Sequence, residues 1–448
     1  MEIRDILHGS ISIEPNELKV IDSPYFQRLR QIKQLGFSEF SFPSASHNRY
    51  IHSIGAMHVA ARVFDSIFSD TKRHVLPIRE SARQRFRSVL RFATLLHDIG
   101  HGPLSHTTEF AMPGVDLLKI PVFPQGLQRK ATHEDFTLKI ILDSGLTPIL
   151  ESAGRAFGFR PVHVAGLVDS AISVLDDFFI ESIDGERVDF RPLLQQIVSS
   201  ELDADRMDYL RRDSLCAGVS YGEFDFDWLV SNLTGHIRSG KCYLTLEHRA
   251  LYTFEDFLIS RLHMFLTVYL HYKGSVYDEM LAKYFGSPDC DYKLPHDIEA
   301  YVNCDDAHLL NHLNASRNPW ARRIIDKKPF KVLIEIHSGI PASEKPNRAQ
   351  KQLVQDLEEN LKVSKIPYIA NRSESELSKY AGKPGEPIYV RYDNIFTAPQ
   401  FLPLEECTDL FERYSEKRSI TRIYVSPEDY ARCQGLSSQY KTAIPTFY

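Results

Sequence analysis

The sequence predicts a mainly α-helical protein with a smaller α/β lobe at its C-terminal end. Apolar residues recur at the three- and four-residue spacing of helices through most of residues 1–285. The later part contains short runs of β-branched and aromatic residues, which indicate strands. A chain of 448 residues suits two or three domains, and we divide it into a core at 1–289 and a lobe at 290–448.

Composition limits the class of protein. The first residues lack the basic and then apolar segments of a secretory signal, and no apolar run approaches the ~20 residues that span a bilayer. The six cysteines form no C-x-x-C pair, so we expect neither a zinc ribbon nor a disulfide framework. We expect a cytoplasmic protein without a membrane partner. A net charge of −6 gives no general reason to expect nucleic-acid binding, and an anionic ligand would need a local basic cluster.

Several helices are predicted in the first part. Asp22-Ser23-Pro24 is typical of a helix start and Gly36 of a stop, with an apolar stripe between them. Apolar periodicity predicts further helices at 51–69, 79–98, 133–144, 161–177, 190–214 and 253–284.

Three strands are predicted in the second part, at 330–338, 386–393 and 422–426. They define the smaller lobe, which carries no recognisable motif. Assembly is the role that we would test for it.

The segment LLHDIGHGPLSH, residues 95–106, carries the strongest chemical signal. His97 and Asp98 stand side by side at the end of a predicted helix, before a glycine break. An isolated pair of this kind is more often structural, but an imidazole and a carboxylate can also converge on one metal ion. His52 and Asp205 could complete the set and leave open positions for water and a phosphate oxygen. Such an ion would lower the pKa of the water and polarise phosphorus.

Seven separated motifs across residues 3–285 resemble one known family, the HD-domain deoxynucleoside triphosphate triphosphohydrolases. They are ILHGSISIEP, IDSPYFQRLRQIKQLG, FPSASHNRYIHSIG, LLHDIGHGPLSH, THED, DADRMDYLRRD and YLHYKGSVYDEM. The resemblance implies an HD-superfamily helical core that binds one divalent ion through His52, His97, Asp98 and Asp205. It implies hydrolysis of a dNTP at the α-phosphate to a deoxynucleoside and inorganic triphosphate. It does not choose among iron, manganese, zinc and magnesium.

The resemblance also implies roles for other residues. Because no P-loop is present, side chains must neutralise the triphosphate. The positions matching phosphate contacts are Arg49, Arg206 and Arg261; Arg206 stands where relatives carry Lys, which replaces a point charge by a planar fork. The sugar and base would meet Tyr209, Asp213, Tyr269, Gln34 and Leu35, with Tyr269 crowding the 2′ carbon to exclude ribonucleotides.

Proton transfer is assigned by the same resemblance. His133 matches the proposed general acid, and Glu109 would orient it, although relatives commonly carry Asp there. His101 and His106 match further histidines that line the phosphate site. A purely structural hydrogen bond is the competing interpretation for each of the three histidines.

Some relatives assemble when a guanine nucleotide binds between subunits. The guanine-reading positions correspond to Asp22, Gln27 and Arg30, so GTP or a dNTP is an expected activator and a homo-oligomer, dimer or tetramer, an expected form. Two departures weaken the match. The basic residue that relatives place before the first motif has no counterpart here, where the chain opens Met1-Glu2, and the second activator site is matched only in fragments, by Phe42 and Arg249.

Two other functions stay open on the sequence. The same metal site could act on another nucleotide or a phosphomonoester. Alternatively, the chain could be a nucleotide-sensing or nucleic-acid-binding assembly, although a pure binding module does not need the complete H…HD…D set. The sugar-pocket residues favour dNTPs, and assays on dNTPs, NTPs and monophosphates would separate these functions.

Overall fold

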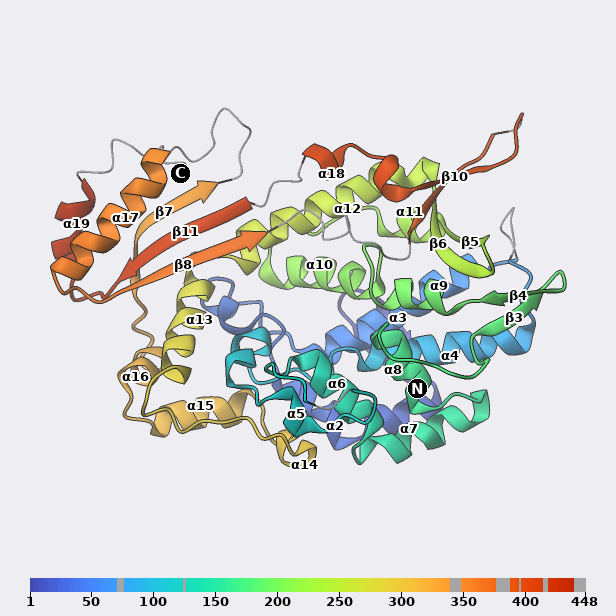
Figure 1. Ribbon diagram of the computed structural model, residues 1–448, viewed down its shortest axis with the longest axis horizontal. Coiled ribbons are helices and arrows are strands. Elements are labelled where there is room, and N and C mark those ends of the chain that lie inside the picture. The colour runs from blue at the N-terminus through green and yellow to red at the C-terminus, as the bar shows by residue number, and fades with distance from the viewer. Residues whose placement is uncertain are drawn as a thin grey trace.

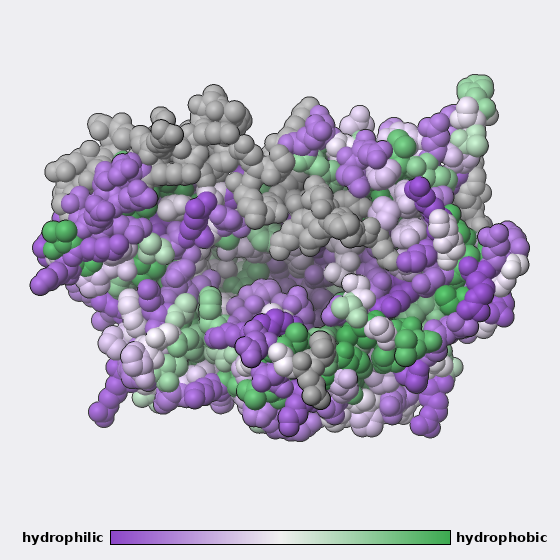
Figure 2. All heavy atoms as spheres, viewed as in Figure 1, coloured by the Kyte–Doolittle hydropathy of each residue, from purple (hydrophilic) through white to green (hydrophobic). Residues whose placement is uncertain are grey.

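Helices dominate the fold, as the sequence predicted (Figure 1). A computed structural model describes residues 1–70, 76–123, 126–338, 348–375, 387–394, 396–413 and 418–438. No helix within these ranges is both long enough and apolar enough to cross a membrane. Hydrophilic residues cover most of the face seen in Figure 2, while the large apolar side chains pack inside.

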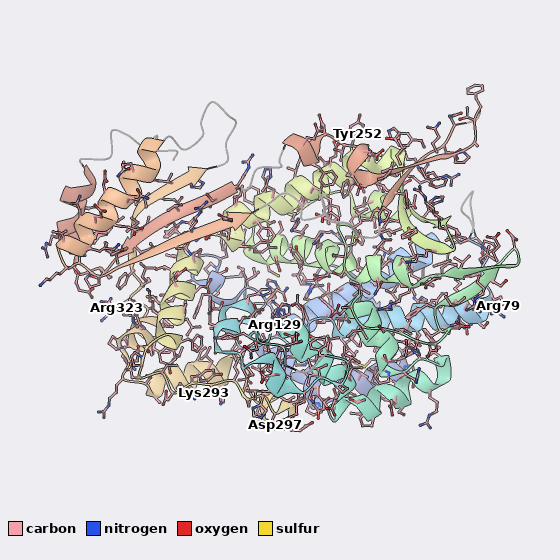
Figure 3. All side chains as sticks on the ribbon, viewed as in Figure 1. Arg79, Arg129, Tyr252, Lys293, Asp297 and Arg323 are labelled. Carbon is pink, nitrogen blue, oxygen red and sulfur yellow. The ribbon has the colours of Figure 1, made fainter. Side chains whose placement is uncertain are left out.

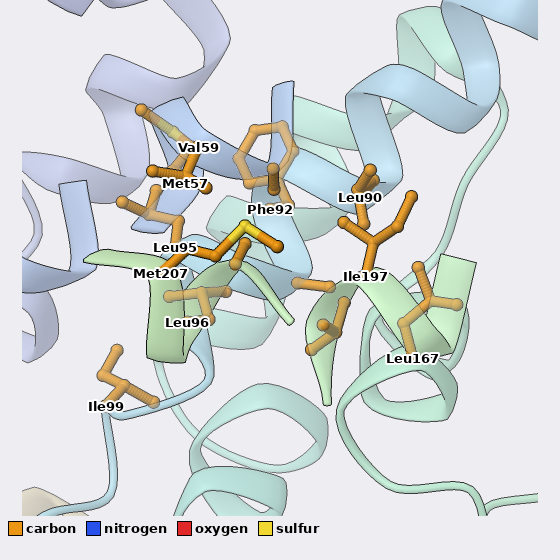
Figure 4. Packing of buried hydrophobic residues seen from close by; sticks show 14 of the residues in the cluster. Met57, Val59, Leu90, Phe92, Leu95, Leu96, Ile99, Leu167, Ile197 and Met207 are labelled. Carbon is orange, nitrogen blue, oxygen red and sulfur yellow. The ribbon is translucent and has the colours of Figure 1, made fainter. Parts of the chain in front are cut away.

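Three helices at the centre of the larger core carry the candidate site: α3 (Arg49–Ile67), α4 (Glu80–Leu96) and α10 (Ala204–Ala217). α3 packs against both α4 and α10. Figure 4 shows the apolar stripe of α4, with Leu90, Phe92, Leu95 and Leu96 directed into the core beside Met57 and Val59 of α3. The helices predicted at 51–69 and 79–98 are confirmed. The C-terminal end of α4 lies at the candidate site.

Other helices surround these three. α6 (His133–Leu142) confirms the helix predicted at 133–144. The remaining helices of the first part are α1 (Pro15–Ile21), α5 (Val115–Leu118), α7 (Leu146–Gly154), α8 (Pro161–Val168), α9 (Arg191–Val198), α11 (Phe226–Ser231), α12 (Leu251–Met264) and α13 (Tyr272–Phe285).

Three predicted helices were too long. The helix predicted at 161–177 ends at Val168, because the Asp169 carboxylate accepts from the Ala171 N–H and forms a turn. The span 190–214 is two helices, since the Asp203 side chain accepts from Arg206 N and starts α10. The span 253–284 divides at a π turn, Phe265–Tyr269, before α13.

The helix predicted to run from Asp22 to Gly36 was also wrong in length. α2 covers only Pro24–Gln27, and a 3-10 turn, Arg28–Gln31, follows it. The Ile32 carbonyl then accepts from Arg49 N at 3.0 Å, a long-range contact that replaces a helical one. Tertiary hydrogen bonding therefore overrides the local helical pattern here.

Strands within the larger core were missed by the helical reading of residues 1–285. β1 (Glu2–Asp5) and β2 (Gly9–Ser12) form an N-terminal hairpin. A second sheet has the order β10-β9-β6-β4-β3, with β5 paired to β6. Its strands are β3 (Ile180–Ile183), β4 (Glu186–Asp189), β5 (Leu233–Arg238), β6 (Lys241–Glu247), β9 (Tyr389–Tyr392) and β10 (Gln400–Pro403). These strands are short, which makes their alternation hard to detect in the sequence.

A three-stranded antiparallel sheet, in the order β7-β11-β8, forms a separate lobe (Figure 1, left). Its strands are β7 (Lys331–Ser338), β8 (Tyr368–Ser375) and β11 (Arg418–Val425). Two helices, α17 (Arg348–Val363) and α19 (Tyr430–Ser438), accompany it, and Leu357, Leu361 and Ile423 lie in its own apolar core. The strands predicted at 330–338 and 422–426 are confirmed here. The strand predicted at 386–393 is β9 of the larger sheet, with residue 386 outside the described part.

The segment just after residue 290 packs on the larger core. It contains α14 (Ile298–Tyr301), α15 (Asp306–Ala315) and α16 (Pro319–Ile325), and Tyr301, Leu309 and Leu313 are fully buried in that core. A short helix, α18 (Leu410–Arg413), lies near α12 (Figure 1). The division into folding units at residue 290 stays a prediction, but apolar packing joins residues 292–325 to the helices before them.

Candidate metal and substrate site

Four side chains from distant parts of the sequence meet at the centre of the larger core. His52 comes from α3, His97 and Asp98 follow α4, and Asp205 lies in the first turn of α10. His52 Nε2 lies 2.9 Å from Asp205 Oδ1, and His97 Nε2 lies 3.3 Å from the same oxygen. Asp98 Oδ2 is 3.5 Å from His52 Nε2, and Asp98 Oδ1 is 3.5 Å from His97 Nε2. The structure thus brings together the complete predicted set.

The imidazoles are oriented to present one nitrogen each. His52 Nδ1 lies 2.9 Å from Asp208 Oδ2, and His97 Nδ1 lies 2.7 Å from the Thr94 carbonyl oxygen. Both acceptors require Nδ1–H, so each Nε2 carries the lone pair. Both Nε2 atoms are buried and, among the described residues, have no hydrogen bond of acceptable geometry despite the nearby carboxylates. Buried acceptors without donors fit a site that a cation completes.

The electrostatics of this centre also favour a cation. Burial alone would lower the pKa of His52, but the nearby carboxylates of Asp205 and Asp208 outweigh it and raise that pKa to about 10. Burial would raise the pKa of Asp205, yet His97 and His52 hold it well below its ordinary value. Positive charge is therefore strongly stabilised between these groups, and two imidazoles with two carboxylates are ordinary ligands for a divalent transition metal.

Three further histidines and Glu109 lie beside the candidate metal site formed by the four side chains above. His101 stacks on His133 with ring centroids 3.8 Å apart, and His101 Nε2 is 3.3 Å from Asp98 Oδ1. Glu109 Oε1 lies 2.5 Å from His133 Nδ1 and 3.1 Å from His106 Nδ1. Burial alone would raise the pKa of Glu109, but the hydrogen bonds with His106 and His133 outweigh burial and lower that pKa to about 2. Glu109, at a position where relatives commonly carry aspartate, therefore still accepts a hydrogen bond from His133 as an ionised carboxylate.

The start of α6 fixes where His133 is held. Asp135 accepts from the Thr132 N–H at 2.7 Å, which caps the helix, and Arg129 pairs with the same carboxylate. Arg129 is labelled near the middle of Figure 3. His133 is the first residue of this capped helix, so its ring is held by both a backbone cap and the Glu109 contact.

The three predicted phosphate arginines are already held by acids. Arg49 pairs with Asp98 through Nη1 and donates to Ser105 Oγ at 2.8 Å through Nε. Arg206 and Arg261 share one buried carboxylate, with Nη1 atoms 3.0 and 3.2 Å from the two oxygens of Glu201. Glu201 was not among the predicted site residues, although an acid five residues before Arg206 could have indicated a partner for that arginine. Glu201 pre-orients two cations that are far apart in sequence.

The predicted sugar-contacting residues form a connected group. Tyr269 in the π turn donates its hydroxyl to Asp213 Oδ2 at 2.8 Å, and its ring centre is 6.2 Å from that of Tyr209. His47 Nε2 lies 2.7 Å from Asp213 Oδ1, a partner that sequence reasoning did not identify. Gln34 is buried, and its side-chain oxygen Oε1 has no hydrogen-bond partner among the described residues, while Leu35 is half-buried against the core.

The predicted activator residues lie in the α1–α2 region. Asp22 is exposed after α1, and Gln27 Oε1 accepts from Arg30 Nε at 2.8 Å. Arg30 also stacks over the Tyr50 ring at 3.6 Å. Phe42 contacts the His271 ring, whereas Arg249 donates to Asn232 Oδ1. Gln27 and Arg30 are therefore adjacent, while Phe42 and Arg249 contact different neighbours.

This geometry defines an HD-type site: an H…HD…D set on three packed helices. Residues 49–212 match the model of the HD domain family. The chain is 28% identical to the deoxynucleoside triphosphate triphosphohydrolase SAMHD1 homolog of Dictyostelium discoideum, and the match covers 99% of this chain and 80% of that relative. The chain therefore contains an HD domain at residues 49–212, and it is similar to HD-domain proteins that include dNTP triphosphohydrolases.

Two other proteins are similar to this chain. The uncharacterized protein MJ1154 of Methanocaldococcus jannaschii is 30% identical over 74% of the chain, which spans only 59% of that relative. A crystal structure of a hypothetical protein from Aquifex aeolicus superposes with a TM-score of 0.70 at 27% identity, covering 97% of this chain and 99% of that one. The fold is thus shared across nearly the whole chain.

Proposed function

We propose that this protein hydrolyses deoxynucleoside triphosphates at the α-phosphate, giving a deoxynucleoside and inorganic triphosphate. The observation that carries the proposal is the convergence of His52, His97, Asp98 and Asp205 beside Arg206 and Arg261. The HD-domain match supports the reaction class, and the name of the Dictyostelium relative supports the substrate class.

One divalent ion would be held by the four converging side chains. When bound, such an ion acidifies water and polarises a phosphoryl oxygen. The protein contributes the lone pairs of His52 and His97, which Asp208 and the Thr94 carbonyl fix in direction. Iron, manganese, zinc and magnesium are the candidates, and the donor set of two imidazoles favours a transition metal over magnesium.

The arginines would bind and orient the triphosphate. Arg206 and Arg261 lie in a low-dielectric site next to Glu201, so exchange of part of that carboxylate's contacts for phosphate oxygens would keep them paired. Arg49 would hold the phosphate nearest to Asp98, because it already joins that carboxylate to Ser105. Fixed cations of this kind stabilise the charge that develops on phosphoryl oxygens.

His133 would donate the proton that the leaving 5′-oxygen needs. Glu109 accepts from Nδ1 and remains ionised near neutral pH, so it fixes the direction of the ring and leaves Nε2 for the proton transfer. His101 and His106 would line the same region and contact phosphate.

Product analysis with a site variant tests this function. We expect the purified chain with Mn²⁺ to convert a dNTP into deoxynucleoside and intact triphosphate, and Asp205→Ala to lower the rate by at least ~100-fold, because it removes the carboxylate that both imidazoles face. The control is Asp177→Ala, an exposed acid paired only with Arg187 among the described residues, which should keep the wild-type rate. Release of monophosphate and pyrophosphate, or equal rates in both variants, would contradict the proposal.

We further propose that a guanine nucleotide binds at Asp22, Gln27 and Arg30 and promotes a homo-oligomer. The exposed Asp22 carboxylate could accept from guanine N1 and N2, and the neighbouring Gln27–Arg30 pair supplies further polar groups. GTP should then raise both the turnover rate and the particle size in light scattering, and Asp22→Ala should remove both effects. A rate and a size that are unchanged by GTP would exclude this activation.

A further inference from the structure

The N-terminal hairpin is connected to the candidate metal site by one buried carboxylate, that of Asp208. His8, in the turn between β1 and β2, places Nε2 2.6 Å from Asp208 Oδ1, while His52 Nδ1 lies 2.9 Å from Asp208 Oδ2. The side chains of His8 and Asp208 are 2% and 0% exposed. We propose that His8 is a positioning residue of the cation site: it holds Asp208, and Asp208 aims His52. This inference rests on the cation site of the proposed function but not on its substrate.

Asp208 has contacts on both oxygens, so its orientation is fixed. Arg212 Nε and Nη2 donate to Oδ2 and Oδ1 at 2.8 and 2.9 Å, in addition to the two histidines. A carboxylate held by these four contacts accepts from Nδ1–H of His52, so the lone pair of His52 Nε2 points into the cation site beside Asp205.

The hairpin turn is itself anchored to the same arginine. Asp5 Oδ1 accepts from the backbone N–H groups of Leu7 and His8 at 2.8 and 2.9 Å, and Asp5 Oδ2 accepts from Arg212 Nη1 at 2.7 Å. A closed ring of contacts therefore runs from Asp5 through Arg212 and Asp208 to His8. The ring ties residues 5–8, which lie outside the matched HD domain at 49–212, to a metal ligand on α3.

A positioning role differs from a packing role in what a mutation changes. His8 also lies near the His58 ring, with centroids 5.1 Å apart, so removing it will cost some stability in either case. Only a positioning role predicts weaker cation binding by protein that is still folded. Outer contacts of metal-ligating histidines typically change metal affinity by about 10- to 100-fold.

The test is a Mn²⁺ titration of the full chain after chelator treatment, followed by calorimetry, with folding checked by circular dichroism. We expect His8→Ala to weaken Mn²⁺ binding at least ~10-fold. His8→Gln should recover most of the affinity, because the glutamine amide nitrogen occupies nearly the position of Nε2 and can donate to Asp208. The matched control is Ser10→Ala on the same hairpin, where the exposed hydroxyl contacts Glu2; it should bind as wild type.

Folded His8→Ala with a Mn²⁺ dissociation constant within twofold of wild type would overturn the inference. If His8→Ala does not fold, His8→Gln is compared with His8→Asn, whose shorter amide does not reach Asp208; equal affinities of these two variants would overturn it as well. A failure of the proposed function can be told apart from a failure of this inference. If the wild-type protein releases no triphosphate from dNTPs, the proposed function is wrong, but the Mn²⁺ affinities of the variants can still follow the predicted order.

Discussion

At the scale of single residues, the candidate site depends on partners that set the direction and charge of its side chains. The types and positions of the candidate ligands could be predicted from short motifs, because H-D and D-x-x-x-Y-x-x-x-D patterns are local in sequence. Their partners could not. Glu201 lies outside the quoted motifs, whereas His47 and Asp208 lie within them without a role that the motif assigns. Only the fold brings these three residues to Arg261, Asp213 and His52.

Tyr269 is predicted to decide between deoxyribose and ribose. Tyr269→Ala should raise the rate on NTPs relative to dNTPs by about tenfold or more, because a ring that crowds the 2′ position is removed. Tyr269→Phe should keep the discrimination, since the ring stays and only the hydrogen bond to Asp213 is lost. Competition assays with paired dNTP and NTP measure the ratio. Tyr252→Ala, at an exposed tyrosine labelled in Figure 3, is the control, and an equal ratio in all variants would contradict this role.

The His47–Asp213 pair predicts a pH dependence of stability. Burial lowers the pKa of His47, but the hydrogen bonds to Asp213 and Cys216 outweigh it and raise that pKa to about 9. Because the folded pKa lies above the unfolded value, the stabilisation is complete below pH ~6.5 and is lost as pH rises through about 9. At ~1.4 kcal/mol per pH unit the loss is at most roughly 3 kcal/mol.

Urea unfolding of wild type and His47→Gln at several pH values checks this. The difference between their free energies of unfolding should shrink between pH 6.5 and 9.5, since glutamine does not titrate. A difference that stays constant or grows over that range would show that His47 is not protonated in the folded state.

At the scale of elements, the loop after α4 is held by a segment far away in the sequence. Arg28 donates to the carbonyl groups of Ile99 and His101, and the Tyr301 hydroxyl donates to Gly100 O at 2.8 Å. Asp306, at the start of α15, accepts from Leu104 N at 2.6 Å and from Lys33 N at 3.0 Å. Leu104 and Ser105 adopt positive φ angles of 55° and 60°, a conformation that non-glycine residues keep only when neighbours impose it.

Asp306→Ala is therefore expected to affect both stability and turnover. It removes the acceptor of one buried and one partly buried N–H group, which should lower the free energy of unfolding by about 2 kcal/mol or more. It should also lower the turnover number, because Ser105 and His106 follow the strained turn. The control is Asp326→Ala, which removes an exposed pair with Arg322 and should change stability by less than about 1 kcal/mol. Denaturant unfolding and initial rates measure both effects; equal behaviour of the two variants would remove Asp306 from this role.

At the scale of the whole molecule, the candidate ion would join three helices whose ligands span residues 52–205. Mn²⁺ at 100 times its dissociation constant should stabilise the folded chain by about 2.7 kcal/mol, because it binds only the assembled site. Thermal unfolding with and without Mn²⁺ measures this as a rise in Tm that a chelator reverses. Asp205→Ala should show little or no rise, and an equal rise in both proteins would place the ion elsewhere.

The sequence by itself determined the helical class, two of the three strands of the small lobe (β7 and β11, but not β8) and the identities of the candidate ligands. Each depends on local information: apolar spacing, β-branched runs and short motifs. The tertiary structure decided where long predicted helices break, that β9 joins the larger sheet, and that residues 292–325 support the loop after α4. It also decided which acid or histidine orients each functional group. Those outcomes depend on contacts between residues separated by 200 positions or more, and no local pattern encodes which distant donor meets which buried acceptor.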